Sequence, residues 1–420
     1  MQKGGSKGLG GFSKARGFQG TKQKNVKGEL TRTRKIFSIG LAAAVVLAVA
    51  PCVGIAAEKV KIGIVCELSG TGAPAGMRWE RGILMAVEEM NAAKGILGRQ
   101  IETFDLDSKT EPPVSVAAMK KAIEYKPFVV MGTVYSSSTV VNMEVLQKAG
   151  IPQFTGSTAP NITQKGNPNI FRVDFSSSLV TLKMVKWITE SLNVKKMAWI
   201  YANDSMGKGL RDDLRPVLEK RGVQITADIV SEVGQADFTG ELARIKTSGA
   251  DTLFIHLHEE ESGRILPQIK EMGLDKSMKR VGVETLVTED TLRLAGDAAN
   301  GVQSHLGLSP VAPEFKPIAE RYQKKYNQAV DHNFLKAYHG FYIVKAITEE
   351  IGAFDQKKLR EGLHNRTLCL KKHPGLIMDV YFDEKGDIDK KSFLVKVEDR
   401  KQVIMGVVPP WNTDKFEKYR

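Results

Sequence analysis

The sequence predicts an α/β protein that consists of two units, each a parallel sheet covered by helices. Strand-like and helix-like segments alternate from residue 60, and the alternation starts again after Asp174. A third observation is that the order changes after Pro310, where two long helical patterns precede β-rich runs. The 420 residues suffice for two or three ordinary domains. Because no low-complexity linker separates the units, we expect short chain crossings to join them.

The first unit begins with a short β-rich run and an amphipathic helix. In that helix, Trp79, Ile83 and Val87 recur on one helical stripe, and Gly95 is a plausible stop signal. The strands of this unit are expected at residues 60–65, 101–106, 128–134 and 151–155, and its helices at 78–91, 114–125 and 139–148.

The second unit repeats this alternation, and the C-terminal third departs from it. In the second unit, helices are expected at 179–192, 207–221, 238–247 and 262–272, and strands at 197–201, 223–230, 252–258 and 280–283. The C-terminal third is expected to supply helices at 314–326 and 334–351 and β-rich runs at 375–382, 392–397 and 403–408. A turn signal at 383–387 joins the first two of these runs. We expect this third to complete both units.

Positive charge is concentrated at the N-terminus. The net charge is +13, but residues 1–57 hold ten Lys/Arg and one acid, which leaves 51 basic and 47 acidic residues in the remainder, a net charge of +4. Nucleic-acid binding would require a basic face or an aromatic-basic motif in the folded part, and the sequence contains neither. We therefore expect no nucleic-acid partner.

Residues 1–57 have the pattern of a basic tail followed by a secretory signal peptide. Arg32, Arg34 and Lys35 precede an uncharged run, which contains a dense apolar stretch and ends in small residues before Glu58. The Gly/Lys-rich first 30 residues are predicted to be disordered, and a start codon assigned too far upstream is one explanation for them. The pattern predicts export to the periplasm with cleavage near Glu58.

Two alternatives remain for this segment. The uncharged run of 22 residues is just long enough for a membrane anchor, although its Ala/Gly-rich composition favours cleavage. Cys52 raises the possibility of a lipoprotein, which Pro51 disfavours because such sites use a small residue there. Only Cys66 and Cys369 remain in the mature chain. Cys66 lies in an apolar strand and is expected to be a buried thiol.

Motifs of enzymes and metal sites are missing or incomplete. Gly207 and Gly209 open a helix after a strand, but Asp212 stands where a dinucleotide-binding motif needs its third glycine. No Walker, HExxH or G-x-S-x-G sequence is present, so we expect neither an enzyme nor a cofactor. His256 and His258, next to Glu259, Glu260 and Glu261, suggest a metal site. We favour a polar strand end, because no other His/Cys pair is evident to complete a coordination shell.

Three polar segments follow predicted strands of the first unit. They are residues 67–72, 135–139 and 156–160, rich in Ser, Thr and Gly. In open α/β sheets, ligands bind beyond the carboxyl ends of the strands. Hydroxyl groups and free N–H groups at helix N-termini attract a carboxylate, but simple helix capping explains each segment equally well.

At these residues the sequence resembles the leucine/isoleucine/valine-binding proteins, which are periplasmic solute receptors of ABC transporters. The resemblance spans about residues 59–410. It rests on Val60-Lys-Ile-Gly-Ile-Val65, Ser69-Gly70, Gly95-Ile-Leu-Gly98, Gly132-x-x-x-Ser136-Ser-Ser-Thr139, Gly156-Ser-Thr158-x-Pro-x-x-Thr163-x-x-Gly166, Asn203-Asp-Ser-Met-Gly207-x-Gly209, Asp237-Phe238 and Ala295-Gly-Asp-Ala-Ala-x-Gly301.

The resemblance implies the type I periplasmic binding protein fold. That fold has two Rossmann-like lobes with parallel sheets, joined by three chain crossings, with the ligand cleft between them. It implies lobe 1 from residues 58–175 and 309–378 and lobe 2 from 176–308 and 379–420. It also implies a monomer that binds a small molecule and docks on an ABC transporter permease.

The resemblance also assigns roles to individual residues. Ser136, Ser157 and Thr158 would hold the α-carboxylate of an amino acid and part of its ammonium group. Glu284 falls where the family's amino-acid binders place the carboxylate that pairs with the α-ammonium, and a buried cation does require such a partner. Donors on one lobe and a carboxylate on the other would favour closure around a zwitterion.

The side-chain pocket departs from the family pattern. Ala75, Met206 and His258 stand at positions where the branched-chain binders carry aromatic residues, and Tyr135 replaces a cysteine that pairs in some members, whose partner is here Ser108. We therefore expect a receptor for an amino acid, without assigning leucine, isoleucine or valine. The alternative is the same fold binding a short amide, a urea-like compound or an aromatic acid for uptake or sensing.

Overall fold

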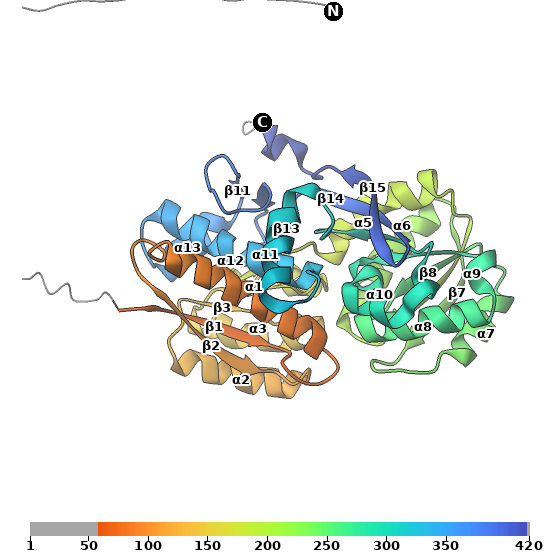
Figure 1. Cartoon of the computed structure of the whole chain (residues 1–420), viewed down its shortest axis with the longest axis horizontal. Helices are drawn as coiled ribbons and strands as arrows, with labels where there is room; N and C mark the ends of the chain where they lie inside the picture. The colour runs from red at the N-terminus through yellow and green to blue at the C-terminus, as the bar shows by residue number, and fades with distance from the viewer. Residues whose placement is uncertain (1–57, 418–420) are drawn as a thin grey trace, which may run out of the picture. The chain divides into compact units, whose positions relative to one another are not determined.

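The computed structural model describes residues 58–417. The predicted basic tail and signal peptide lie outside the described residues, and so does the cleavage site (Figure 1). Within residues 58–417, none of the helices has the length and apolar character needed to cross a membrane.

A five-stranded parallel sheet forms the first lobe, with the strand order β2-β1-β3-β4-β5. Its strands are β1 (Val60–Cys66), β2 (Ile101–Asp107), β3 (Val129–Met131), β4 (Gln153–Thr155) and β5 (Ile170–Arg172). The helices between them are α1 (Ala73–Ala92), α2 (Pro112–Glu124), α3 (Ser136–Ala149) and α4 (Asn161–Gln164).

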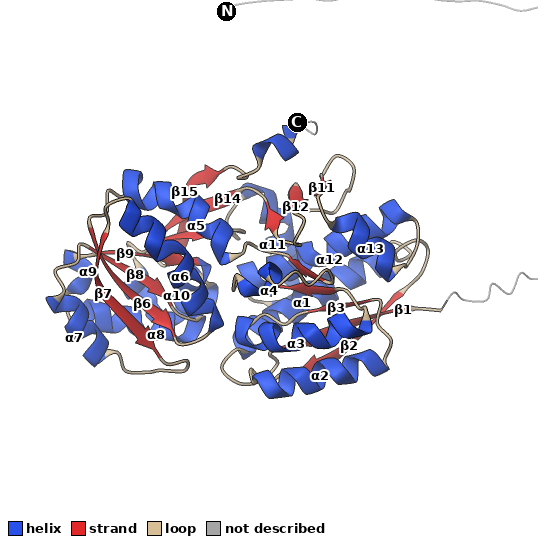
Figure 2. Cartoon of the chain, turned by 180° about the vertical axis from the view of Figure 1, so that it is seen from behind, coloured by secondary structure: helices blue, strands red, loops and turns tan. Residues whose placement is uncertain are grey.

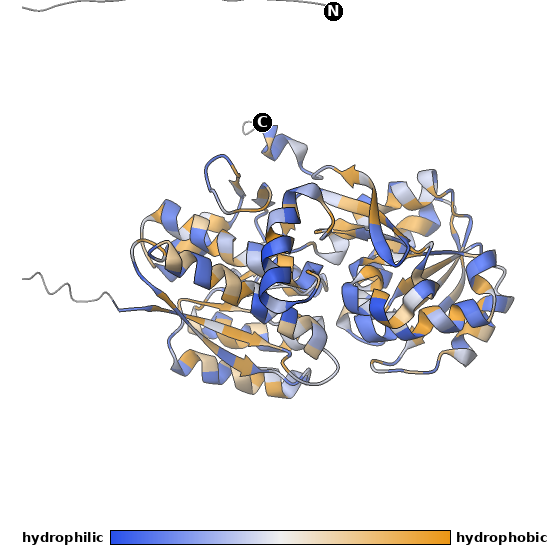
Figure 3. Cartoon of the chain, in the orientation of Figure 1, coloured by the Kyte–Doolittle hydropathy of each residue, from blue (hydrophilic) through white to orange (hydrophobic). Residues whose placement is uncertain are grey.

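Alternate residues of β1 contribute to two different hydrophobic clusters, as the period of a strand requires. Ile62 and Ile64 pack with Trp79 and Ile83 of α1, whereas Val65 packs with the cluster formed by α2 and α3. Helices therefore cover both faces of the sheet, with α1 on one side and α2 and α3 on the other (Figures 1 and 2). Apolar residues line the strands, and polar residues lie on the outer helix faces (Figure 3).

A seven-stranded sheet forms the second lobe, with the order β15-β14-β10-β9-β8-β6-β7. The strands from β10 to β7 are parallel, and β14 and β15 form an antiparallel edge. The strands are β6 (Lys196–Ala202), β7 (Gln224–Ser231), β8 (Thr252–His256), β9 (Lys279–Val283), β10 (Gln303–Leu306), β14 (Ser392–Glu398) and β15 (Lys401–Val408). The helices are α5 (Ser177–Lys186), α6 (Ser205–Lys220), α7 (Thr239–Thr247), α8 (Glu259–Glu271), α9 (Leu274–Ser277) and α10 (Glu289–Ala295).

Three further helices and a small sheet lie between β10 and β14 in the chain. The helices are α11 (Lys316–Tyr326), α12 (His332–Ile351) and α13 (Gln356–Leu363), and the strands are β11 (Arg366–Leu368), β12 (Val380–Phe382) and β13 (Ile388–Asp389). α12 packs along α1 of the first lobe, and Arg321 of α11 forms an ion pair with Glu89 of α1 at 3.0 Å.

The chain passes between the two lobes at three places: after β5, after β10 and after β13. The lobe boundaries expected from the sequence stay a prediction. The strand pairing differs from that expectation in one segment. Residues 379–389 were expected in lobe 2, but β12 and β13 pair with β11 in a sheet of their own, and Gly386 accepts a hydrogen bond from Arg172 of β5. The third crossing therefore falls between β13 and β14.

The predicted alternation of strands and helices is confirmed, with differences at several boundaries. α3 begins at Ser136 rather than residue 139, so the serine cluster forms its first turn. β8 ends at His256 and α8 begins at Glu259, so the predicted strand over 252–258 is two residues too long and His258 lies outside it. Strands β5 and β10 and helices α10 and α13 were not predicted, because short segments carry little periodicity.

Candidate functional site

Polar loops of both lobes line a small cavity of about 30 Å³. Seven of the eight sequence-predicted site residues line it, namely Ala75, Tyr135, Ser136, Thr158, Met206, His258 and Glu284. Glu259, Thr285, His332, Asn333 and Lys336 also line it and were not predicted as ligand-binding residues. Pockets for small molecules typically measure about 300–1,000 Å³, so an amino acid can enter only if the lobes separate or these side chains move.

The lining residues meet because many of them follow the carboxyl ends of parallel strands; His332, Asn333 and Lys336 lie instead on α12, which follows α11. Tyr135 and Ser136 come after β3, and Thr158 comes after β4. In the other lobe, His258 comes after β8 and Glu284 directly after β9. This is the position at which open α/β sheets bind ligands.

Ser157 is the predicted residue that does not line the cavity. Its hydroxyl group donates to the carbonyl of Val134 at 2.8 Å and lies 2.7 Å from Oγ1 of Thr139. Ser136 makes the complementary contact, since its Oγ accepts from the N–H groups of Thr158 and Ala159, each at 3.2 Å. The side chain of Ser157 therefore fixes the two loops to each other.

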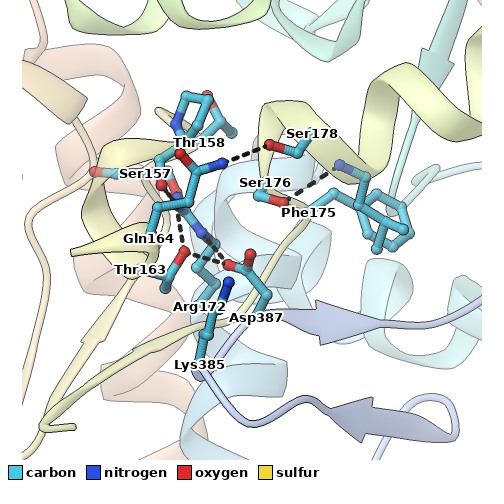
Figure 4. Close-up of polar contacts among 12 residues, drawn as sticks. Ser157, Thr158, Thr163, Gln164, Arg172, Phe175, Ser176, Ser178, Lys385 and Asp387 are labelled. Atoms are coloured by element: carbon cyan, nitrogen blue, oxygen red, sulfur yellow. Dashed lines mark hydrogen bonds and ion pairs between the residues drawn. The ribbon is translucent and has the colours of Figure 1, made fainter. Parts of the chain in front are cut away.

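Arg172 binds the backbone of the loop that contains Ser157 and Thr158 (Figure 4). The guanidinium group, which is completely buried, donates to the carbonyls of Ser157 and Ala159 at 2.5 and 2.6 Å. It also pairs with Asp387 at 2.5 Å, and Asp387 accepts from Thr163 at 2.8 Å. Because the carbonyls point toward Arg172, the arginine sets the backbone orientation of the loop. The sequence did not identify it.

Glu67 holds the other loop in a similar way. Its carboxylate accepts from the backbone N–H groups of Val134 and Tyr135, each at 3.1 Å. Burial raises the pKa of Glu67 to about 7, although these two hydrogen bonds oppose the shift. Glu67 therefore positions the segment that leads into α3.

The ring of Tyr135 stacks on the imidazole of His258 across the cavity, with 4.2 Å between centroids. Nε2 of His258 lies 2.8 Å from Oδ2 of Asp204. Burial alone would lower the pKa of His258, but the carboxylate of Asp204 outweighs it and the pKa rises to about 9. Burial likewise opposes ionisation of Asp204, yet the imidazolium lowers the pKa of Asp204 to about 2. The pair is charged at neutral pH.

The metal-site alternative gains no support from the described part of the chain. No group of three or more His, Cys, Asp or Glu side chains suitable for a metal ion occurs in residues 58–417. Cys66 and Cys369 are both buried and unpaired, which confirms the expected buried thiol at Cys66.

Glu284 has a cationic partner within the protein itself. Nζ of Lys336, on α12, lies 3.4 Å from Oε1 of Glu284 and 3.2 Å from Oδ2 of Asp174. Asp174 also pairs with Lys390 at 2.7 Å, so these four groups form a neutral buried cluster of two carboxylates and two ammonium groups. Sequence reasoning missed Lys336, because a lysine within a helical pattern is normally solvated.

Two lobes built on mainly parallel sheets, linked by three crossings and lining a cavity at their strand ends, define a two-lobed ligand-binding protein. The chain belongs to the periplasmic binding protein family, whose sequence signature matches residues 59–402. This family is one of solute-binding proteins, and the expected type I fold is confirmed.

Several named relatives are similar over most of the chain. The leucine-, isoleucine-, valine-, threonine- and alanine-binding protein of Pseudomonas aeruginosa is 28% identical over 342 residues, which cover 81% of this chain and 90% of the relative. The Leu/Ile/Val-binding protein of Escherichia coli is 27% identical over 274 residues, covering 64% of this chain and 73% of the relative.

Solved structures share the fold. The branched-chain amino acid transporter substrate-binding protein of Streptococcus pneumoniae, in complex with isoleucine, is 25% identical with a TM-score of 0.75 and covers 84% of this chain and 100% of that one. A solute-binding protein of an ABC transporter from R. palustris, in complex with benzoate, is 19% identical with a TM-score of 0.76, covering 84% and 97%.

Proposed function

We propose that this protein is an exported receptor that captures an amino acid between its lobes and delivers it, as a monomer, to the permease of an ABC transporter. The observation that carries the proposal is the cavity lined by predicted residues of both lobes. Membership of the periplasmic binding protein family and relatives named for amino acids support it. The proposal includes the signal peptide expected in residues 1–57. It assigns no catalytic activity to the protein.

The two lobes offer complementary groups for a zwitterion. Ser136 and Thr158, together with the N–H groups of the first turn of α3, suit a carboxylate. Glu284 and Glu259, on the second lobe, are the carboxylates available to an ammonium group. Tyr135, Ala75, Met206 and His258 would then surround the side chain of the ligand.

The second candidate is an acid or amide that lacks an ammonium group. Such a ligand brings no ammonium group to pair with Glu284, which counts against it if that carboxylate has no other partner. Lys336 weakens that argument, because it supplies Glu284 with an ammonium group from the protein. Proteins of this fold bind such compounds, as the benzoate complex illustrates.

A ligand screen distinguishes the two candidates. Residues 58–420 would be purified, unfolded to release any bound compound, refolded, and heated with each of the twenty amino acids, benzoate, 4-hydroxybenzoate, acetamide and urea. Mass spectrometry would identify the released compound. We expect an amino acid to be released and to raise the melting temperature, because a ligand that binds only the folded state stabilises it. A response confined to the aromatic acids or amides would favour the second candidate.

A further inference from the structure

Glu259 differs from the other acidic side chains around the cavity. It lines the cavity and is 7% exposed, and its Oε1 accepts a hydrogen bond from Nδ2 of Asn333 at 3.1 Å. The backbone N–H group of Glu259 also bonds to the carboxylate, but within residues 58–417 no Lys, Arg or His nitrogen lies within 4.0 Å of it. A buried carboxylate without a counter-ion is costly.

The two nearest cations are bound to other carboxylates. His258, the residue before Glu259, is paired with Asp204 at 2.8 Å. Lys336, one helical turn after Asn333, lies between Asp174 and Glu284 at 3.2 and 3.4 Å. The charge of Glu284 is thus balanced inside the protein, and that of Glu259 is not.

The other acidic residues in the same helical turn have different partners. Acidic residues in a first helical turn interact favourably with the helix dipole, and Glu259, Glu260 and Glu261 all lie in the first turn of α8. However, Glu260 pairs with Arg264 at 3.2 Å, and Glu261 accepts from the N–H group of Gly234. Of the three, Glu259 is the one that lines the cavity.

The position of Glu259 is fixed from both lobes. Oγ1 of Thr291, on α10, donates to its carbonyl at 3.0 Å, and Asn333, on α12, holds its side chain. Burial raises its pKa, while His258 and Asn333 oppose the shift. A cationic group placed beside this carboxylate would supply the missing counter-ion without displacing any existing ion pair.

We propose that Glu259, rather than Glu284, receives the ammonium group of the ligand, and that Lys336 retains Glu284 as a fixed internal ion pair. The inference rests on the proposed function and makes it more specific. The ligand carries a carboxylate for the hydroxyl-rich loops of the first lobe and a cationic nitrogen for Glu259. Closing the lobes brings both ends of the ligand to their partners.

Paired ligands test this assignment by titration calorimetry. The probes are the twenty amino acids, each hit being compared with its analogue in which hydrogen replaces the ammonium group, such as L-leucine with 4-methylpentanoate. In Glu259→Gln we expect an affinity loss of about thirtyfold or more for the amino acid, equivalent to about 2 kcal/mol, and little change for the analogue. Glu284→Gln should keep the preference for the amino acid over the analogue.

Glu260→Gln is the matched control, because it changes the same residue type one position further along α8, outside the cavity. It should bind like the parent. If Glu259→Gln does not fold, as judged by near-UV circular dichroism, Glu259→Asp replaces it. Glu259→Asp keeps the negative charge, but its side chain is one methylene group shorter and so places the carboxylate further from the ligand. It should still bind the amino acid about tenfold more weakly.

The outcomes separate this inference from the proposed function. If Glu259→Gln keeps the preference for the amino acid and Glu284→Gln loses it, Glu284 is the ammonium partner and the inference is wrong, while the proposed function stands. If Glu259→Asp binds the amino acid with the affinity of the parent, the inference is also wrong. If no amino acid binds the parent protein, the proposed function fails and the inference fails with it.

Discussion

His258 illustrates how burial and a neighbouring charge act together on one residue. The imidazole is 4% exposed, which by itself would favour the neutral form. The carboxylate of Asp204 at 2.8 Å reverses that preference. At a position where the family resemblance leads one to expect an aromatic ring, the chain thus places a cationic ring that still stacks on Tyr135.

This pair should make stability depend on pH. Because the pKa of His258 rises from 6.5 to about 9 on folding, its contribution is fully present below pH 6.5 and is lost as the pH rises through about 9. Asp204, whose pKa falls from 3.8 to about 2, contributes fully above pH 3.8. We expect the free energy of unfolding of the parent, relative to His258→Gln, to fall by about 3 kcal/mol between pH 6 and pH 9.5.

Urea unfolding of both proteins at a series of pH values measures this difference. Subtracting the variant curve removes the contributions of groups that titrate in the same range independently of His258, such as Lys183, with a pKa of about 8. Parallel curves for the parent and His258→Gln would show that the pair does not stabilise the fold.

At the residue scale, the sequence predicted the positions that follow from strand order. Ser136, Thr158 and Glu284 follow the carboxyl ends of β3, β4 and β9, so their position at the strand ends of the two lobes could be foreseen. The orientation of Ser157 toward Val134 could not, since it depends on the path of the loop. Lys336 likewise depends on how α12 packs against the second lobe.

At the scale of elements, the start of α1 shows how closely a helix can approach a strand end. Gly76 lies in the first turn of α1, and a Cβ atom at this position would lie 1.9 Å from the carbonyl oxygen of Glu67. Only glycine permits this approach. The same carbonyl belongs to the residue whose carboxylate holds the loop before α3.

Gly76→Ala should therefore destabilise the protein. The added methyl group must push α1 away from the end of β1, and overpacking of this kind typically costs about 1–3 kcal/mol. Gly240→Ala in α7 is the matched control, because no atom outside its own helix backbone lies within 4 Å of the place that a Cβ atom would take and alanine favours helix. Chemical denaturation should show a loss in the first variant and no loss in the second; equal stability of the two would contradict the close approach.

Element boundaries show the limits of sequence patterns most clearly. The long elements, such as α12 and β6, follow the hydrophobic period and were placed well. Strand β12 occupies only Val380–Phe382 of the predicted run 375–382, because apolar residues before it serve the core in an irregular segment. Strands β5 and β10 are too short to be distinguished from a loop by alternation alone.

At the scale of the whole described chain, one ammonium group connects the three crossings between the lobes. Lys390, in the third crossing, donates to Asp174 in the first at 2.7 Å and to the carbonyl of Gly307 in the second at 3.0 Å. Lys336 extends this cluster to Glu284 at the cavity. The crossings and the candidate site are thus linked by a continuous set of buried charges.

The central claim is that the ligand is captured between the two lobes. Small-angle X-ray scattering of residues 58–420, with and without the amino acid found by the ligand screen, tests it most directly. We predict that saturating ligand lowers the radius of gyration, as hinge closure does, toward the value of the arrangement in which Lys336 lies 3.4 Å from Glu284. An identical scattering curve with and without saturating ligand would contradict the account.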